Sequence, residues 1–163
     1  MVHKIALLIP MIVMAAIIGA MGLSLFPLKV KNKALEFAQG KVEINGDLIN
    51  VEIAKSSAER QRWLMFRQEK IPLNSAMILV YDKPDLYSMW LLNIEYNLDL
   101  IWVDESGQIV YVVKDAPPCK NTLDPSSCTY KNTKAAKYVI AATSGFINRH
   151  KITMESKMTV ISI

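Results

Sequence analysis

The sequence predicts a β-rich α+β protein in which a compact antiparallel sheet curls into a small barrel or sandwich with one or two short helices, preceded by one transmembrane helix. Two observations support this fold class. Seven or eight short segments rich in β-branched and aromatic residues alternate with turn residues, and one run of 22 uncharged, mostly apolar residues extends from Ile5 to Phe26. We therefore divide the chain into an anchor or signal segment (1–28), a charged tether (29–40) and a single β-rich domain (41–163).

The apolar run from Ile5 to Phe26 is long enough to cross a membrane. As a helix it would measure about 33 Å, whereas the apolar part of a cleaved secretory signal has only about 7–15 residues. This length favours a retained anchor, so the membrane is the first partner that the sequence predicts. The small residues Ala20 and Gly22 leave a cleaved signal and a secreted domain as the alternative.

Two hairpins are the clearest local structures expected in the domain. Residues 41–44 and 48–54 flank Asn45-Gly46-Asp47, and Asn-Gly readily supplies the positive φ angles of a tight turn. The second hairpin joins residues 100–103 to 109–113 through a turn at 104–107. Further strands are expected at 77–81, 86–92, 138–142 and 158–163, with a short helix or turn at 145–148.

A short helix is predicted after the first hairpin. Ser56 or Ser57 is a typical N-cap, because a serine oxygen can accept a hydrogen bond from the first helical turn. We expect this helix to continue to about Phe66, with Trp63, Leu64 and Phe66 as its buried end.

The only two cysteines, Cys119 and Cys128, predict a disulfide. Residues 124–127 are a turn signal that folds the chain back between the two sulfurs, and a disulfide implies an oxidising compartment. We therefore expect the domain to lie outside the cytoplasm. The positive-inside rule favours the opposite orientation, because three lysines follow the apolar run and one precedes it.

Signatures of common enzyme classes are missing from the sequence. It contains no HExxH, GxSxG, glycine-rich phosphate loop or CxxC pair. Two cysteines and two remote histidines do not make a metal site, so no metal and no cofactor are predicted. His150 lies in a polar, cationic stretch and is expected to be a solvated surface side chain. The lysines have no interleaved aromatic residues, so nucleic acid is not an expected partner.

The segment 88–99 is the best candidate for a ligand-binding site, because it places polar and aromatic residues between strands. Trp90 would form a stacking wall, while Asn93 and Asp99 would donate or accept hydrogen bonds. The structural alternative makes Trp90 a core residue, Asn93 a turn cap and Asp99 an acceptor for loose backbone N–H groups. Glu52 is the fourth candidate.

We expect a non-enzymatic module that binds an envelope component or a protein partner through the face from Trp90 to Asp99. One alternative is a hydrolase or isomerase in which Glu52 and Asp99 act as an acid–base pair, which requires their carboxyl groups to lie within about 5–10 Å of each other. Another is an accessory protein that stabilises a membrane complex through residues 5–26.

An ordered series of short motifs resembles the domain of unknown function 192 family. The series covers most of residues 41–163 and comprises Val51-Glu52-Ile53-Ala54, Leu64-Met65-Phe66-Arg67, Ala76-Met77-Ile78-Leu79-Val80, Trp90 with Asn93 and Leu98-Asp99, the hairpin around Asp104-Glu105-Ser106-Gly107, Pro118-Cys119 with Cys128-Thr129-Tyr130, and Tyr138-Val139-Ile140. The resemblance implies a small, often exported or membrane-anchored β-rich domain. No activity follows from it.

The chain also departs from that family pattern. Trp63 and Ala76 replace expected glycines, and Ala141 replaces an expected glutamate. No lysine lies between Trp90 and Asn93, and Glu155-Ser156 stands where a Gly-Asp pair is usual. If the family used that lysine or glutamate chemically, this chain could not, which favours a binding role.

Overall fold

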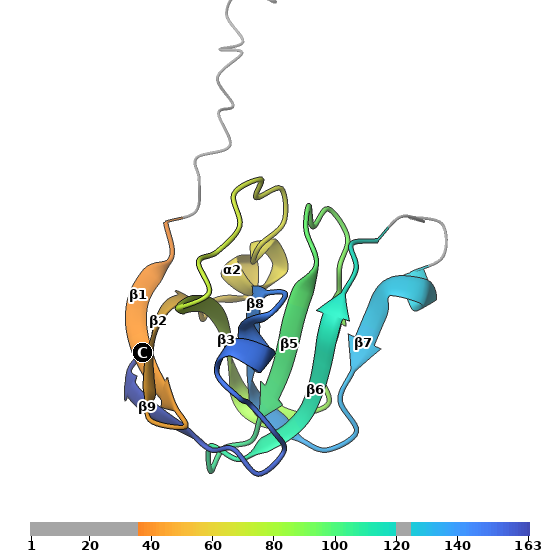
Figure 1. Ribbon diagram of the computed structural model, residues 1–163. Coiled ribbons are helices and arrows are strands. Elements are labelled where there is room, and N and C mark those ends of the chain that lie inside the picture. The colour runs from red at the N-terminus through yellow and green to blue at the C-terminus, as the bar shows by residue number, and fades with distance from the viewer. Residues whose placement is uncertain (1–35, 120–124) are drawn as a thin grey trace, which may run out of the picture. The chain divides into compact units, whose positions relative to one another are not determined.

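The computed structural model describes residues 36–119 and 125–163, which form one compact unit beginning at Glu36 (Figure 1). Its strands are β1 (Ala38–Ile44), β2 (Asp47–Ala54), β3 (Ser75–Asp85), β4 (Ser88–Trp90), β5 (Leu98–Val103), β6 (Ile109–Ala116), β7 (Thr129–Lys131), β8 (Ala136–Thr143) and β9 (Met158–Ser162). Helices α2 (Ser57–Arg62) and α3 (Phe146–Arg149) and the 3-10 turn η1 (Pro125–Cys128) complete the unit.

The predicted β-rich α+β class is confirmed, but the main sheet is mixed rather than antiparallel. Seven strands lie in the order β6-β5-β8-β3-β2-β1-β9, and β4 pairs only with β7 in a separate ribbon. Strands β2 and β3 are parallel, with Ile53 opposite Ile78. The 20-residue connection that contains α2 allows this parallel return, whereas a short hairpin loop would have forced an antiparallel pair.

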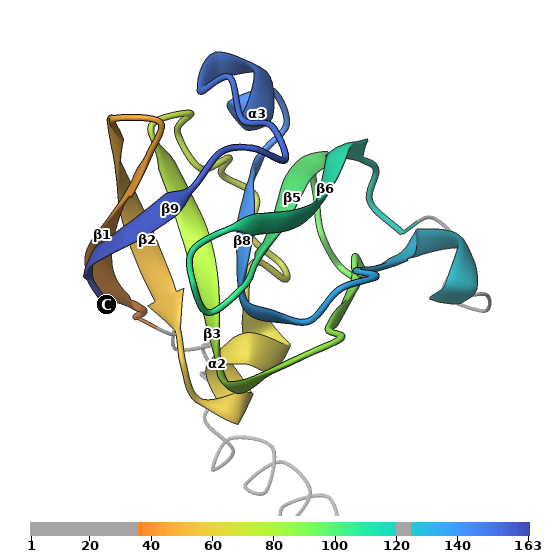
Figure 2. The ribbon, with the colours of Figure 1, turned by 90° about the horizontal axis from the view of Figure 1, so that it is seen from below.

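The sheet curls without closing into a barrel. In the part of the chain that the structure describes, the edge strands β6 and β9 are joined only beside their first residues. The contact there comprises a bridge between Gln108 and Lys157 and a few hydrogen bonds, among them one of 2.7 Å from Met158 N to Gly107 O. Figure 2 shows β9 crossing at the edge of the curved sheet and running beside β1 to the C-terminus. The expected barrel or sandwich is therefore corrected to an open, curled sheet.

Alternating side chains of the sheet build two hydrophobic cores. Met77 and Leu79 of β3 belong to the core on one face, and Ile78 and Val80 to the core on the other. Helix α3 covers one end of the second core with Phe146. The first core packs against the segments around α2 and β4, which therefore determine its surface.

The N-cap of α2 is confirmed and its C-terminus is corrected. Ser56 and Glu59 form a reciprocal capping box, which satisfies two N–H groups at the helix start. The helix ends at Arg62 rather than near Phe66, because Trp63 (φ 26°) and Phe66 (φ 63°) leave the helical conformation. Trp63 is buried as expected, but the side chain of Phe66 is 52% exposed.

Among the described residues, no helix is long and apolar enough to cross a membrane. The predicted span from Ile5 to Phe26 lies outside the described residues.

Candidate functional site

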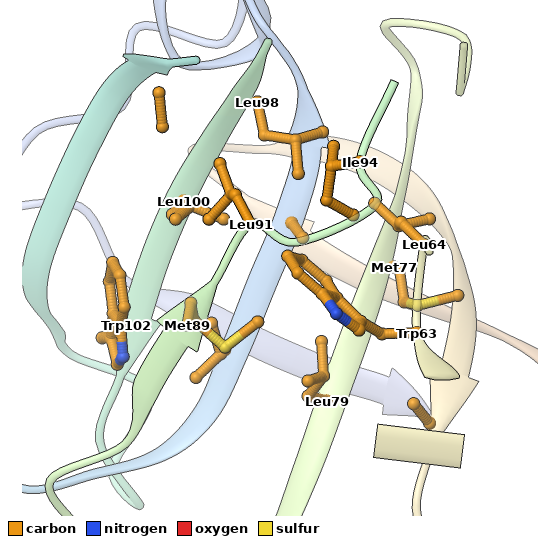
Figure 3. Close-up of a cluster of buried hydrophobic side chains, with 14 of the residues drawn as sticks. Trp63, Leu64, Met77, Leu79, Met89, Leu91, Ile94, Leu98, Leu100 and Trp102 are labelled. Carbon is orange, nitrogen blue, oxygen red and sulfur yellow. The ribbon is translucent and has the colours of Figure 1, made fainter. Parts of the chain in front are cut away.

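Trp90 lies at the rim of an open groove between α2 and β4. The groove has a volume of about 350 Å³ and is mostly apolar; it is lined by Arg60, Gln61, Trp63, Met65, Leu79, Tyr81, Ser88, Met89, Trp90 and Leu92. Its floor belongs to the first hydrophobic core, where Figure 3 shows Trp63 among Met77, Leu79 and Met89. The side chain of Trp90 is 40% exposed, so it is a wall of the groove rather than a core residue.

A cationic and aromatic stack forms one side of this groove. The guanidinium of Arg60 lies 5.0 Å from the ring centroid of Tyr81, and Tyr81 stacks on Tyr87 with 3.5 Å between centroids. Arg60 also donates hydrogen bonds to the carbonyls of Lys55 and Val80, which fix its orientation. Burial raises the pKa of Tyr81 to about 12 although the charge of Arg60 opposes the shift, so Tyr81 is a neutral phenol at physiological pH.

The disulfide confirms the cysteine prediction and braces the strand that carries Trp90. Cys119 and Cys128 are bonded to each other. The backbone N–H of Leu91 donates to Cys128 O at 3.2 Å, and its carbonyl accepts from Cys119 N at 3.1 Å. Both half-cystines therefore hold the residue next to Trp90.

Glu52 pairs with a residue that the sequence reasoning had not selected. Its two carboxylate oxygens accept hydrogen bonds of 2.7 and 2.8 Å from the guanidinium of Arg67. The hydrogen bond to Glu52 raises the pKa of Arg67 above its ordinary value. Because both oxygens are occupied by a fixed cation, Glu52 is held as a structural carboxylate that joins β2 to the chain after α2.

The hydroxyl of Tyr96 is buried near this ion pair. Burial raises the pKa of Tyr96, although the charge of Arg67 and the backbone of Ile71 oppose that shift.

Asn93 has a local structural role. Its φ angle is 54°, a left-handed conformation that asparagine adopts more readily than most residues. Its carbonyl accepts a hydrogen bond of 2.7 Å from Phe66 N, which ties the segment after α2 to the segment after β4. This tie positions Met65 and Leu92 on the same groove.

Asp99 is buried and bound to three backbone N–H groups. One oxygen accepts from Asp115 N at 2.8 Å, while the other accepts from Gly145 N at 3.1 Å and Ile147 N at 2.8 Å. With 2% of its surface exposed, the side chain does not face the groove. Asp99 therefore has the role given by the structural alternative, in which its carboxylate accepts hydrogen bonds from loose backbone N–H groups.

The structure does not bring Glu52 and Asp99 together. Across the sheet, Glu52 lies opposite Met77, Met77 lies opposite Ala141, and Ala141 lies opposite Leu100. Three strand spacings, or about 14 Å, therefore separate Glu52 from Leu100, which follows Asp99 in the sequence. Leu100 belongs to the first core, and Asp99 therefore points to the other face. An acid–base pair of these two carboxylates does not fit this geometry.

His150 corrects the expectation of a solvated histidine. It is buried, its Nε2 donates to the carbonyl of Leu73 at 2.7 Å, and its Nδ1 lies 2.6 Å from a carboxylate oxygen of Asp47. The imidazole thus links α3 to the start of β2. Exposure had been expected because the neighbours of His150 in the sequence are polar and cationic. Its burial could not be predicted, because both hydrogen-bond partners lie more than 70 residues away and leave no local pattern.

Sequence reasoning found Trp90 but missed most of the groove. Arg60, Trp63 and Met65 come from the segment after β2, and Tyr81 comes from β3, so the groove combines three separated stretches. The clustering of Arg60, Trp63 and Met65 near the end of the predicted helix was the available signal. Within residues 36–119 and 125–163, no three His, Cys, Asp or Glu side chains converge on a possible metal position.

Comparisons with known proteins agree on the family and the fold. The sequence profile of the domain of unknown function 192 family, described as an uncharacterised conserved region, matches residues 40–160. No curated protein matches the chain.

Two crystal structures share the fold. A protein of Sinorhizobium meliloti 1021 described as a proposed transcription regulator has 19% identity and a TM-score of 0.68, covering 77% of this chain and 96% of that one. A protein of unknown function from Novosphingobium aromaticivorans DSM 12444 has 23% identity and a TM-score of 0.68, covering 78% of this chain and 89% of that one. At these identities the likeness extends to the fold alone. Because the family profile spans most of the sequence, the chain belongs to the domain of unknown function 192 family.

Proposed function

We propose that this protein is a membrane-anchored, extracytoplasmic binding module of the cell envelope and not an enzyme. The observation that carries the proposal is the apolar groove at Trp90, which stays open at the surface while the remaining candidate residues serve the fold. Glu52 is paired with Arg67 and Asp99 with backbone N–H groups, so neither carboxylate is available at the groove.

The location rests on two features of the chain. The disulfide between Cys119 and Cys128 supports an oxidising compartment, and the apolar run from Ile5 to Phe26 supports attachment to the membrane. Together they support a domain held at the outer face of the cytoplasmic membrane, where its groove meets envelope components.

Photo-crosslinking tests the binding role. The full chain, carrying a benzophenone amino acid at the exposed groove residue Gln61, is irradiated in the source membrane, and adducts are identified by mass. We expect a discrete adduct that disappears in Trp90→Ala, because that change removes the groove wall without opening the core. The same label at the exposed Arg149 of α3 is the control for random collisions. An identical adduct pattern at both positions, or none at Gln61, would contradict binding through the groove.

A second experiment tests the orientation. A cysteine introduced at the exposed Asp82 is treated in intact cells with a maleimide that cannot cross membranes. We expect labelling before lysis if the domain lies outside. Labelling only after lysis would place the domain in the cytoplasm.

A further inference from the structure

We infer that the groove binds the membrane itself. The surface involved, called here the α2–β4 face, is formed by Arg60, Arg62, Phe66 and Trp90. This face rests on a bilayer rich in anionic lipid headgroups. This inference rests on the proposed anchored binding function and names the partner of the same groove.

Exposed aromatic side chains give the α2–β4 face the composition of a membrane-interface surface. Trp90 is 40% exposed and Phe66 is 52% exposed, on the two segments that the Phe66–Asn93 backbone hydrogen bond joins. An indole with one apolar face and one N–H group is favoured at the boundary between headgroups and acyl chains. The apolar groove beside Trp90 offers room for the upper part of an acyl chain.

An excess of positive charge lies near these aromatic rings. The stretch from Lys55 to Lys70 contains five basic and two acidic residues. Glu59 is engaged in the capping box, and Arg67 is already paired with Glu52. Within the described ranges, Arg60 and Arg62 form no ion pair.

The two arginines are instead held by neutral groups. Arg60 donates to backbone carbonyls, and the guanidinium of Arg62 lies 4.7 Å from the ring centroid of Phe66. Their charges are therefore directed by the fold but not neutralised, which is the arrangement that anionic headgroups complement.

The described chain begins beside the segment that leads into α2. Ala38, at the start of β1, lies opposite Ile53, at the end of β2, and α2 begins four residues later. Phe37 packs against the same core from which the groove opens. About ten residues separate Phe37 from Phe26, so a chain anchored through residues 5–26 can place Phe37 at most about 35 Å from the membrane.

The opposite end of the domain provides the matched control. The β1–β2 turn lies beside α3, because Asn45 donates hydrogen bonds to the carbonyls of His150 and Lys151, and Figure 2 shows α3 and α2 at opposite ends of the sheet. Arg149 of α3 is exposed. Arg149→Glu therefore makes the same charge change as Arg62→Glu, but far from the α2–β4 face.

Quenching of Trp90 fluorescence by brominated lipids tests the inference. The full chain is reconstituted into phosphatidylcholine vesicles with or without phosphatidylglycerol, and the signal of Trp90 is obtained as the difference between the natural chain and Trp90→Phe. Trp63 and Trp102 are buried, and because Trp63 also lines the groove, the same difference is measured again in a Trp63→Phe background. We expect strong quenching of Trp90 in the phosphatidylglycerol vesicles and a docking equilibrium at least about tenfold weaker in Arg62→Glu, while Arg149→Glu behaves like the natural chain.

Circular dichroism of each variant confirms that its fold is retained. Equal quenching in both kinds of vesicle, or no change in Arg62→Glu, would overturn the role of anionic headgroups. Absence of Trp90 quenching would overturn the lipid inference altogether. In that case, a protein adduct at Gln61 in the photo-crosslinking experiment would leave the binding function standing with a protein as the occupant, and no adduct would contradict both proposals.

Discussion

At the scale of single residues, Asp99 accepts hydrogen bonds from Asp115, Gly145 and Ile147 while almost fully buried. Asp99→Ala should lower the free energy of unfolding by about 3 kcal/mol, because buried N–H groups lose a charged acceptor. Urea denaturation measures the loss. Asp85→Ala is the matched control, since Asp85 accepts one exposed N–H from Leu86 and its removal should cost less than about 1 kcal/mol. Equal losses in the two variants would contradict a structural role for Asp99.

Asp104 makes the stability of the β5–β6 turn depend on pH. One carboxylate oxygen accepts hydrogen bonds from Ser106 N, Ser106 Oγ and Gln108 N. Partial burial opposes the shift, but these hydrogen bonds hold the pKa of Asp104 below its ordinary value of 3.8. A lowered pKa in the folded state means that the stabilisation is complete above about pH 4 and is lost as the pH falls through the folded-state pKa.

The corresponding test is thermal unfolding as a function of acidity. We expect Asp104→Asn to lose less stability than the natural chain between about pH 5 and pH 3, because the variant no longer takes up the proton. Ser106→Ala, which removes one of the donors, should give an intermediate acid dependence. An unchanged acid dependence in Asp104→Asn would show that this turn does not contribute.

At the scale of elements, the contact between β6 and β9 depends on a glycine. Gly107 has a φ angle of 87°, and a Cβ added there would lie 2.1 Å from the carbonyl oxygen of Met158. Gly46, in the β1–β2 turn, has a φ angle of 85° and open space around it. The two positions share the conformational requirement and differ only in the neighbour.

Alanine substitutions at Gly46 and Gly107 distinguish the cost of a positive φ angle from the cost of a steric clash with Met158. Gly46→Ala should lower the free energy of unfolding by about 1 kcal/mol, because it forces an L-residue into the left-handed region. Gly107→Ala should lower it by at least about 2 kcal/mol, since β9 must also move away from β6. Chemical denaturation of both variants checks the difference, and equal losses would mean that the start of β9 moves away from β6 at no cost in stability.

Helix α2 has one end that could be predicted from the sequence and one that could not. Its N-terminus was predicted because a serine N-cap at Ser56 or Ser57 is a local pattern, and the structure adds Glu59 to complete a capping box. Its C-terminus was not, because Phe66 leaves the helix to donate a hydrogen bond to Asn93, a residue 27 positions further along the chain. Such a partner has no signature near residue 66.

At the scale of the whole molecule, the disulfide connects stability to the groove. Cys119→Ser combined with Cys128→Ser should lower the free energy of unfolding by about 2.5–3 kcal/mol, because a loop of about ten residues is no longer closed in the unfolded chain. Thermal unfolding with and without reductant measures the effect on the natural chain. Equal unfolding midpoints under both conditions would contradict a stabilising disulfide.

Sequence patterns were sufficient to predict the β-rich class, both hairpins, the capped start of α2, the pairing of Cys119 with Cys128 and the family. Each of these follows from a local pattern or an ordered series of motifs. The sequence also selected Trp90 as a candidate site residue, while leaving a core position for Trp90 open as the alternative.

Tertiary structure alone decided the mixed sheet and the roles of the candidate residues. The parallel pairing of β2 with β3 placed Glu52 on one face of the sheet and left Asp99 on the other, although both lie in strands with similar sequence patterns. The groove unites side chains from α2, β3 and β4, and the partners of His150 lie more than 70 residues away. Contacts between residues far apart in the sequence place these side chains together. They are stabilised by the simultaneous burial of both hydrophobic cores and not by a local conformational preference.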